Sequence, residues 1–326
     1  MAKVLVTGAA GFVGSHTVEG LLEAGHEVTG VDNMSTGREE NLASFAGHRH
    51  WRLIQQDILD VQSFFRSVGT AKPDVIVHLA ALVSVRESMA NPSLNFEQNI
   101  RAVQVVADAA AKAGVRRLIF ASSAAVYGDS GEVPFAEESA TRPLNPYGEA
   151  KLAGESLVLE QGRARGFEAV CLRYFNVYGP RQPGDSPYSG VVSRFIDRLR
   201  NGKPPLIFGD GKQTRDFIHV HDVARANVLA ASIPVPLAGI FNICTGHELA
   251  IDELAAAFRR QFPSLLMPIY EPALAGEIKR SIGRPERARD ILGFSAQIAV
   301  STGLQEFQLL PESRLKNNES CSSLQH

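Results

Sequence analysis

The chain of 326 residues carries 33 Lys and Arg against 35 Asp and Glu, which gives a formal net charge of -2. Hydrophobic residues make up 44% and charged residues 21%, a composition that supports a sizeable core and excludes collagen-like or globally disordered chains. The balanced charge gives no basic face for non-specific nucleic-acid binding, so no nucleic-acid partner is expected. An anionic ligand would have to be held by a few placed cations and backbone amides.

Cysteine usage and hydropathy indicate the compartment. The three cysteines, Cys171, Cys244 and Cys321, lie far apart without a CxxC pair, which is typical of reduced thiols and predicts a cytoplasmic protein. No apolar run approaches the roughly 18 residues of a membrane span, so no membrane association is expected. The polar, aperiodic segment 311–326 is expected to be a disordered tail.

Short apolar runs alternate with helical patterns through the first half of the chain. The alternation predicts an α/β fold, a doubly wound parallel sheet of the Rossmann type. The expected strands are Val4 to Thr7, Glu27 to Val31, Leu53 to Gln55, Val75 to His78, Leu118 to Ala121 and Glu168 to Leu172. The expected helices between them include Phe12 to Ala24, Ser93 to Ala113 and Pro146 to Arg165.

Beyond Gly179 the strand–helix rhythm is lost, although helical patterns continue. The expected helices here are Ser189 to Asn201, His221 to Ala231 and Asp252 to Gln261. This change predicts a second, smaller α/β lobe that grows from the ends of the sheet. The expected division is 1–178 and 179–310, with the two lobes interleaved.

A glycine-rich loop joins the first expected strand to the first expected helix. Gly8, Gly11 and Gly14 form a GxxGxxG pattern, which allows a tight turn and a close approach of the backbone to a pyrophosphate at the helix N-terminus. Asp32 ends the second strand, where a carboxylate accepts hydrogen bonds from an adenosine ribose and favours NAD over NADP. The alternative is a purely structural turn. Asp57 could flank the adenine or cap the next helix.

A second set of residues carries hydroxyl chemistry. Tyr147 and Lys151 stand four residues apart on one face of an expected helix, and Ser122 and Ser123 follow a strand at the sheet edge where ligands bind. A tyrosine acting as a base at neutral pH needs its pKa lowered by about three units from near 10. A neighbouring ammonium and a positive nicotinamide ring could together supply this shift. The alternative is a surface Tyr, a solvated Lys and a capping Ser.

Several further motifs accompany these residues in order along the chain. They are His78-Leu-Ala-Ala81, Ser122-Ser-Ala-Ala-Val-Tyr-Gly128, Pro146-Tyr-Gly-Glu-Ala-Lys151 and Leu172-Arg-Tyr-Phe-Asn-Val-Tyr-Gly-Pro180. From Lys3 to about Phe294 the chain resembles the extended short-chain dehydrogenase/reductases, and more narrowly the nucleotide-sugar epimerases of the UDP-glucose 4-epimerase type.

This resemblance implies roles for the three central residues. Tyr147 would take the proton of the sugar 4-hydroxyl, Lys151 would lower the pKa of Tyr147 and hold the nicotinamide ribose, and Ser123 would hydrogen-bond the 4-oxygen. NAD would stay bound through a transient 4-keto sugar, with no net redox change. The implied cofactor-binding residues are Gly8, Gly11, Phe12, Val13, Gly14, Asp32, Asn33, Ser35, Thr36, Gly37, Asp57, Ile58, Leu79, Ala80, Ala81, Asn99, Ser122, Tyr147, Lys151 and Tyr174.

Two alanines narrow the set of reactions that the chain could catalyse. Dehydratases and decarboxylases that resemble this chain carry an additional acid after the serine, whereas Ala124 and Ala125 stand here and cannot transfer a proton. Oxidation and re-reduction at C4 remain, which predicts an epimerase. The alternatives are another nucleotide-sugar epimerase or reductase, or a catalytically silent NAD-binding scaffold.

The resemblance also implies a UDP-sugar substrate. Arg215 would grip the diphosphate with its planar fork, while Leu274 stands where relatives carry a second phosphate-binding arginine. Lys279, Arg280 and Arg284 are candidates to replace that charge. The implied substrate-binding residues are Ser84, Ser123, Asn176, Val192, Phe208, Arg215, Glu277 and Ser281.

Some of these assignments have alternatives or finer consequences. Phe208 could instead be part of the core. Ser84 and Ser281 resemble members that accept N-acetyl sugars, which predicts turnover of UDP-GlcNAc and UDP-GalNAc besides UDP-glucose and UDP-galactose. His219 and His221 suggest a metal site, but the family has a similar stretch without a metal, so none is expected.

A homodimer is predicted from the composition of two expected helices. Both carry small apolar residues on more than one face, which suggests pairing beyond the sheet, and the family resemblance implies a four-helix interface. The residues are Ala102, Val106, Ala109 and Ala110 on the first helix, and Leu152, Leu157 and Leu159 on the second.

Overall fold

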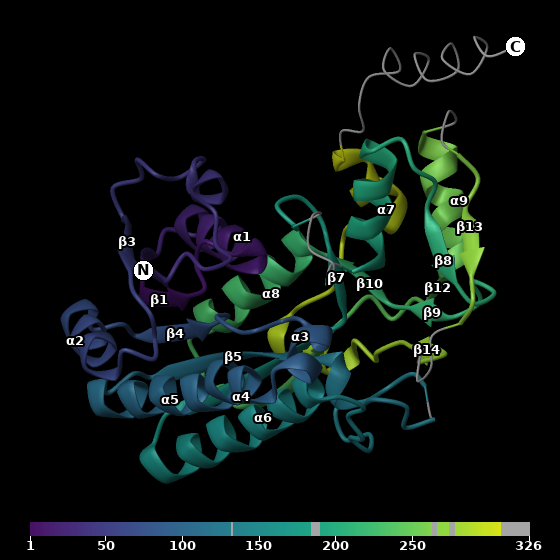
Figure 1. The fold of residues 1–326 in the computed structure, drawn as a ribbon. Coiled ribbons are helices and arrows are strands. Elements are labelled where there is room, and N and C mark those ends of the chain that lie inside the picture. Colours follow the sequence, from purple (N-terminus) through teal and green to yellow (C-terminus); the bar gives the residue numbers. More distant parts are fainter. Residues whose placement is uncertain (132, 184–189, 263–265, 274–277, 308–326) are drawn as a thin grey trace, which may run out of the picture.

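The computed structural model describes residues 1–131, 133–183, 190–262, 266–273 and 278–307. Within these ranges seven parallel strands form a central sheet in the order β11-β6-β5-β4-β1-β2-β3 (Figure 1). Its strands are β1 (Lys3–Thr7), β2 (Glu27–Asp32), β3 (Trp51–Gln55), β4 (Val75–His78), β5 (Arg117–Ser123), β6 (Glu168–Tyr174) and β11 (Gly239–Ile243). The order reverses between β1 and β4, which opens a crevice at their carboxyl ends. The predicted fold class is confirmed.

Helices cover both faces of this sheet (Figure 1). On one face α1 (Phe12–Glu23) and α8 (Val220–Ser232) bury their apolar sides, and on the other α2 (Val61–Ala71), α5 (Ala102–Ala113) and α6 (Pro146–Arg165) do so. All four residues of β4 are buried, as expected for a strand covered on both sides. Because both faces are covered, the carboxyl ends of the central strands are left free to form a site.

Local signals set the ends of α6, which carries the Tyr-x-x-x-Lys pair. Asn145 accepts the Gly148 N–H at 2.9 Å, and Pro146 occupies the first helical position, where its missing N–H costs little. Gly166, with φ at 80°, ends the helix in the left-handed conformation. The structure thus gives the bounds that the pattern predicted.

The expected helix from Ser93 to Ala113 is helical throughout but not uniform. It consists of α4 (Pro92–Phe96), a π-helical turn η2 (Glu97–Arg101) and α5, and a separate short helix α3 (Val85–Ala90) precedes it. The wider turn places Asn99 against the backbone of Leu82, whose N–H and C=O it binds at 2.9 and 2.8 Å. The spacing of apolar residues does not reveal a π-helical turn, because one additional residue in a single turn barely changes that spacing.

The second lobe lies beyond the carboxyl ends of the central strands (Figure 1). Phe195 and Phe258 meet edge-on in its own apolar core. Its helices are α7 (Val191–Arg200), α9 (Ile251–Gln261) and α10 (Val300–Gly303), with the short turn η5 (Leu304–Glu306). The π-helical turn η4 (Ala288–Leu292) packs instead against α8 and β11 of the first lobe. Its strand groups are β7 (Asn176–Tyr178) with β10 (Phe217–His219), β8 (Leu206–Phe208) with β13 (Ile269–Glu271), and β9 (Thr214–Arg215) between β12 (Leu249–Ala250) and β14 (Arg280–Ser281).

The chain crosses between the lobes more than once. Both α8 and β11 come from beyond residue 179, yet α8 packs on α1 and β11 pairs with β6 in the central sheet. The predicted tail, 311–326, lies outside the described residues. None of the helices in the described ranges has the length and apolarity needed to cross a membrane.

Candidate functional site

A cavity of about 1190 Å³ lies between the glycine loop, the carboxyl edge of the sheet and the second lobe. A volume of this size exceeds that of an ordinary small-molecule pocket and suits two large ligands side by side. Most residues expected from the sequence line it: Gly8, Gly11, Phe12, Val13, Gly14, Asp32, Asn33, Ser35, Thr36, Gly37, Asp57, Ile58, Leu79, Ala80, Ala81, Ser84, Ser122, Ser123, Tyr147, Tyr174, Asn176, Val192, Phe208 and Arg215.

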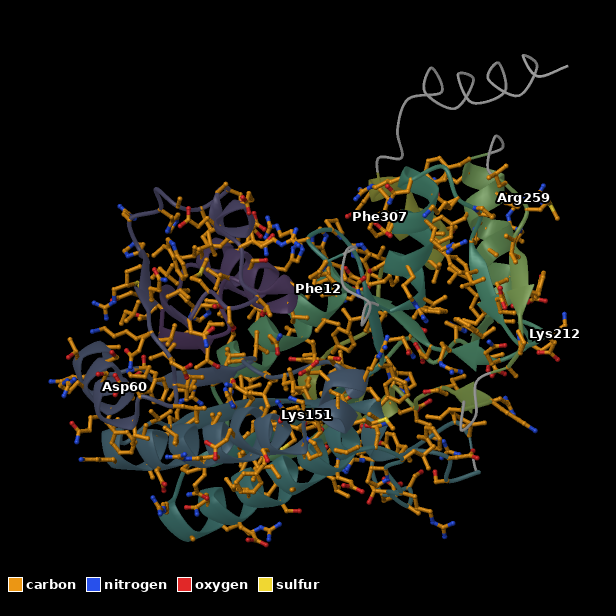
Figure 2. All side chains as sticks on the ribbon, viewed as in Figure 1. Phe12, Asp60, Lys151, Lys212, Arg259 and Phe307 are labelled. Atoms are coloured by element: carbon orange, nitrogen blue, oxygen red, sulfur yellow. The ribbon has the colours of Figure 1, made fainter. Side chains whose placement is uncertain are left out.

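Three expected site residues within the described ranges are not on this wall. Asn99, Lys151 and Ser281 are buried behind it, and Glu277 lies outside the described residues. Figure 2 shows Lys151 near the middle of the molecule, whereas Lys212 and Arg259 lie at the outer side of the second lobe. Lys151 is therefore a buried residue of the interior and not part of the cavity wall.

The glycine loop fits a bound pyrophosphate. Gly8 has φ at 69°, and a Cβ there would lie 2.8 Å from the Ala80 nitrogen, while a Cβ at Gly14 would lie 1.9 Å from the Gly8 oxygen. Gly11, which has no side chain to cap with, precedes α1, so the positive end of this helix remains open toward the cavity. Only glycines allow this close approach of helix, strand and phosphate.

Two carboxylates, those of Asp32 and Asp57, line the cavity. Asp32 is buried at the end of β2, where it accepts the Ala10 and Met34 N–H groups at 2.9 and 2.8 Å and keeps oxygen lone pairs for ribose hydroxyls. Asp57 accepts the Leu59 N–H at 2.8 Å and lines the cavity. The residue that caps α2 is Asp60, so the alternative that Asp57 caps this helix was wrong.

Tyr147 and Ser123 face the cavity together. The Ser123 hydroxyl accepts the Ala125 N–H at 3.1 Å and hydrogen-bonds Tyr147. Burial raises the pKa of the Tyr147 hydroxyl above its ordinary value, and the hydrogen bond from Ser123 partly offsets this rise. The structure thus places two hydroxyl groups at the cavity wall. The Ser123 hydroxyl both caps the turn at Ala125 and hydrogen-bonds Tyr147.

Lys151 supports this pair from below. Its Nζ donates to the Ala121 carbonyl at 2.9 Å and lies 5.0 and 5.8 Å from the ring centroids of Phe120 and Tyr147. Burial lowers the pKa of Lys151 to about 8, while the Glu155 carboxylate opposes that shift. The ammonium is therefore still largely protonated at pH 7.

Three expected cofactor residues direct their side chains elsewhere. Ser122 donates to Glu155, and Tyr174 donates to Asn227 at 2.7 Å. Asn99 donates to the Asn95 side chain at 2.7 Å and to the Leu82 carbonyl. Asn99 holds the loop after β4 in place. The hydroxyls of Ser122 and Tyr174 are engaged within the protein, so these two residues can contact a ligand only through their other atoms, which line the cavity.

The second lobe supplies the other end of the cavity. Arg215 lines it and donates to the Thr214 carbonyl at 2.8 Å, and Asn176 donates to the Asp216 carbonyl at 3.1 Å. Phe208 is half-buried on the wall rather than in the apolar core of the lobe. The core alternative for Phe208 was therefore wrong.

A further cation at this end was not found from the sequence. Arg194 on α7 lines the cavity, whereas Arg280, a candidate to replace the charge missing at position 274, pairs with Glu248 at 2.7 Å and is not on the wall. The position of Arg194 depends on how α7 packs, which no local motif reveals.

Ser84 lines the cavity and also caps α3 by accepting the Glu87 N–H at 2.9 Å.

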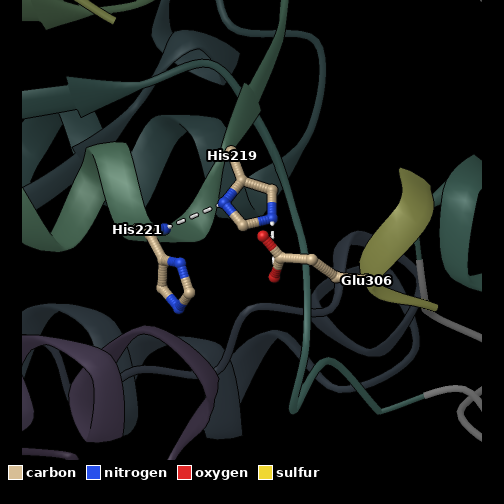
Figure 3. A group of neighbouring side chains, drawn as sticks. All are labelled: His219, His221 and Glu306. Carbon is tan, nitrogen blue, oxygen red and sulfur yellow. Dashed lines mark hydrogen bonds and ion pairs between the residues drawn. The ribbon is translucent and has the colours of Figure 1, made fainter. Parts of the chain in front are cut away.

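His219, His221 and Glu306 form a separate cluster, with their ligating atoms within 4.8 Å of one another (Figure 3). His219 Nδ1 accepts the His221 backbone N–H at 3.4 Å, so the proton of the neutral ring is on Nε2, 3.5 Å from the Glu306 carboxylate. Burial lowers the pKa of His219 to about 4. Nδ1 thus caps α8, whereas Nε2 is buried without a hydrogen-bond partner among the described residues.

Comparisons with known proteins agree with this geometry. Residues 4–244 match the model of the "NAD dependent epimerase/dehydratase family". A UDP-glucose 4-epimerase of Mycolicibacterium smegmatis is 37% identical over 303 residues, which is 93% of this chain and 96% of that protein.

Solved structures give the same result. A Thermotoga maritima UDP-glucose 4-epimerase with UDP-glucose has a TM-score of 0.87 at 34% identity, covering 97% of this chain and 99% of that one. A Methanobrevibacter ruminantium M1 UDP-N-acetylglucosamine 4-epimerase in complex with UDP-N-acetylmuramic acid has a TM-score of 0.88 at 33% identity, covering 98% and 99%.

Proposed function

The chain belongs to the NAD dependent epimerase/dehydratase family, and we propose that its substrates are UDP-hexoses. It is an isomerase that catalyses the NAD-dependent 4-epimerisation of a UDP-sugar. The observation that carries the finer proposal is the single cavity that joins the glycine loop, the hydroxyl pair of Tyr147 and Ser123, and the cation Arg215.

Each residue of the site has its own role in the proposed reaction. NAD would be held by the glycine loop and Asp32, and when bound it would supply a hydride acceptor and donor for C4 of the sugar. Tyr147 takes the proton of the 4-hydroxyl, and Ser123 holds the 4-oxygen beside it. Because burial raises the pKa of Tyr147, the Lys151 ammonium beneath its ring is needed to stabilise the phenolate. Ala124 and Ala125 supply no second acid, so the 4-keto sugar is not diverted to elimination.

The substrate range is the finer part of the proposal. The charge at Arg215 and Arg194 suits the diphosphate, and the ring of Phe208 offers a surface for the base. The small Ser84 on the wall leaves room for an acetamido group, and the similarity to a UDP-N-acetylglucosamine 4-epimerase supports this reading. We therefore propose that both plain and N-acetylated UDP-hexoses are substrates.

The test is direct. We expect purified protein, incubated separately with UDP-glucose, UDP-galactose, UDP-GlcNAc and UDP-GalNAc, to give the 4-epimer of each in NMR spectra without added reductant. Accumulation of free NADH would instead favour a dehydrogenase, and the absence of any turnover would favour a silent scaffold. Turnover of the unsubstituted pair alone would contradict the N-acetyl part.

Assembly stays a prediction. The four residues expected to pair on α5 are buried in the chain's own core, so they no longer support a dimer. The exposed Met89 and Phe96, on the helices α3 and α4 that pack against α6, support the prediction instead. We expect light scattering to give the mass of a homodimer at micromolar concentration; the mass of one chain would contradict this.

Location also stays a prediction. Cys171 and Cys244 are buried free thiols, which supports the proposal of a reducing, cytoplasmic environment.

A further inference from the structure

A buried charge network lies directly beneath the catalytic residues. Arg173 on β6 binds Glu155 on α6 through two parallel hydrogen bonds of 2.8 and 2.7 Å, and both side chains are at most 3% exposed. Ser122 on β5 donates to the same carboxylate. The guanidinium also donates to the Glu137 carbonyl at 3.0 Å and stacks 4.7 Å from the Tyr127 ring centroid. One carboxylate therefore joins α6, β5 and β6.

This network is adjacent to Lys151 along α6. Glu155 follows Lys151 by four residues, which places the two side chains on one helix face. The Lys151 ammonium is buried and has the Ala121 carbonyl as its hydrogen-bond acceptor, with the Phe120 ring nearby. A buried ammonium is costly unless a negative charge nearby compensates it.

The other groups around Lys151 do not provide that charge. His78 on β4 is neutral at pH 7, because burial and the Lys151 charge lower the pKa of His78 to about 3. Tyr147 on α6 is a neutral phenol at rest, since burial raises its pKa. Burial also keeps the Cys171 thiol on β6 protonated by raising its pKa. On α4 and η2 the buried polar residues are the uncharged Asn95 and Asn99.

We propose that Glu155 is a positioning residue whose carboxylate keeps the Lys151 ammonium charged and fixed beneath Tyr147, while Arg173 and Ser122 hold that carboxylate in place. The role rests on the proposed function, since it acts through the pair that carries out proton transfer. The support is geometric: both side chains are buried, they stand four residues apart on α6, and Ser122, which binds Glu155, directly follows Ala121, whose carbonyl accepts from Lys151.

The experiment compares NAD-loaded wild type with Glu155→Gln and with the double variant Glu155→Gln/Arg173→Met. The single variant leaves a buried unpaired guanidinium, which can prevent folding, whereas the double variant removes both charges together. The readouts are the pH titration of the ¹³Cε resonance of Lys151, assigned by its loss in Lys151→Met, and the pH profiles of kcat and KM.

A matched control is available in the same sheet. Glu168→Gln breaks the contact between the partly exposed Glu168 and the buried Arg117 at the amino ends of β6 and β5. We expect this variant to lose stability without moving the Lys151 titration or the pH profile.

In either Glu155 variant, we expect Lys151 to titrate lower than in wild type, by at least about one pH unit in Glu155→Gln and by less in the double variant, which also loses the nearby Arg173 charge. The alkaline limb of kcat should move down with it, while KM for the UDP-sugar changes less than about twofold. An unmoved Lys151 titration in a folded variant would overturn the inference, whatever the activity. A shifted titration in a chain that epimerises no UDP-sugar would uphold the charge contact and count against the proposed function alone.

Discussion

Tyr147→Phe is expected to fold and retain NAD yet lose roughly 10³-fold in kcat, in line with the loss of a general base. Phenylalanine keeps the ring that packs near Lys151 and removes only the hydroxyl that hydrogen-bonds Ser123. No other side chain on the described wall combines a hydroxyl with a buried ammonium near its ring. The measurement is kcat with saturating UDP-sugar, alongside the absorbance of bound cofactor.

Tyr178→Phe is the matched control. Among the described residues the Tyr178 hydroxyl is buried without a hydrogen-bond partner, in the second lobe and away from the cavity wall. Removing it should leave kcat unchanged and stability equal or slightly higher. Near-normal turnover by Tyr147→Phe, or an equal loss in both variants, would show that Tyr147 is not the base.

Arg117→Met is expected to lower the free energy of unfolding by about 3–5 kcal/mol while leaving kcat nearly unchanged. The Arg117 side chain is fully buried at the start of β5, where it binds Glu168 at 2.6 Å. It also donates to the carbonyls of Ala230, Ile233 and Val235 at the end of α8. Methionine fills a similar volume but leaves these carbonyls and the carboxylate without their donor.

The measurement is denaturant unfolding of the NAD-loaded protein. Arg101→Met serves as a comparison, because Arg101 forms an exposed pair with Glu97 one helical turn away, worth about 0.5 kcal/mol or less. A loss at Arg117 no larger than that at Arg101 would show that the α8 carbonyls find other partners. A large loss of kcat at unchanged cofactor content would show that the amino end of β5 is coupled to the site.

Local patterns in the sequence determined the parts of the site that depend on neighbours along the chain. The glycine spacing dictates a tight turn because a Cβ at Gly14 would meet the Gly8 oxygen at 1.9 Å, a contact within one loop. Tyr147 and Lys151 share a face because helical geometry brings every fourth residue together. Asp32 lies at the carboxyl end of β2 because the apolar run that forms this strand ends there.

Only the tertiary structure decided the contacts between segments that are distant in the sequence. Arg173 and Glu155 meet because β6 packs on α6, Arg194 reaches the cavity because α7 packs across it, and β11 returns to the sheet from the second lobe. Asn99 and Ser281 lie behind the wall although they were expected on it. Whether a side chain faces a cavity depends on the packing of its whole element against others, and apolar periodicity reports only which face is buried.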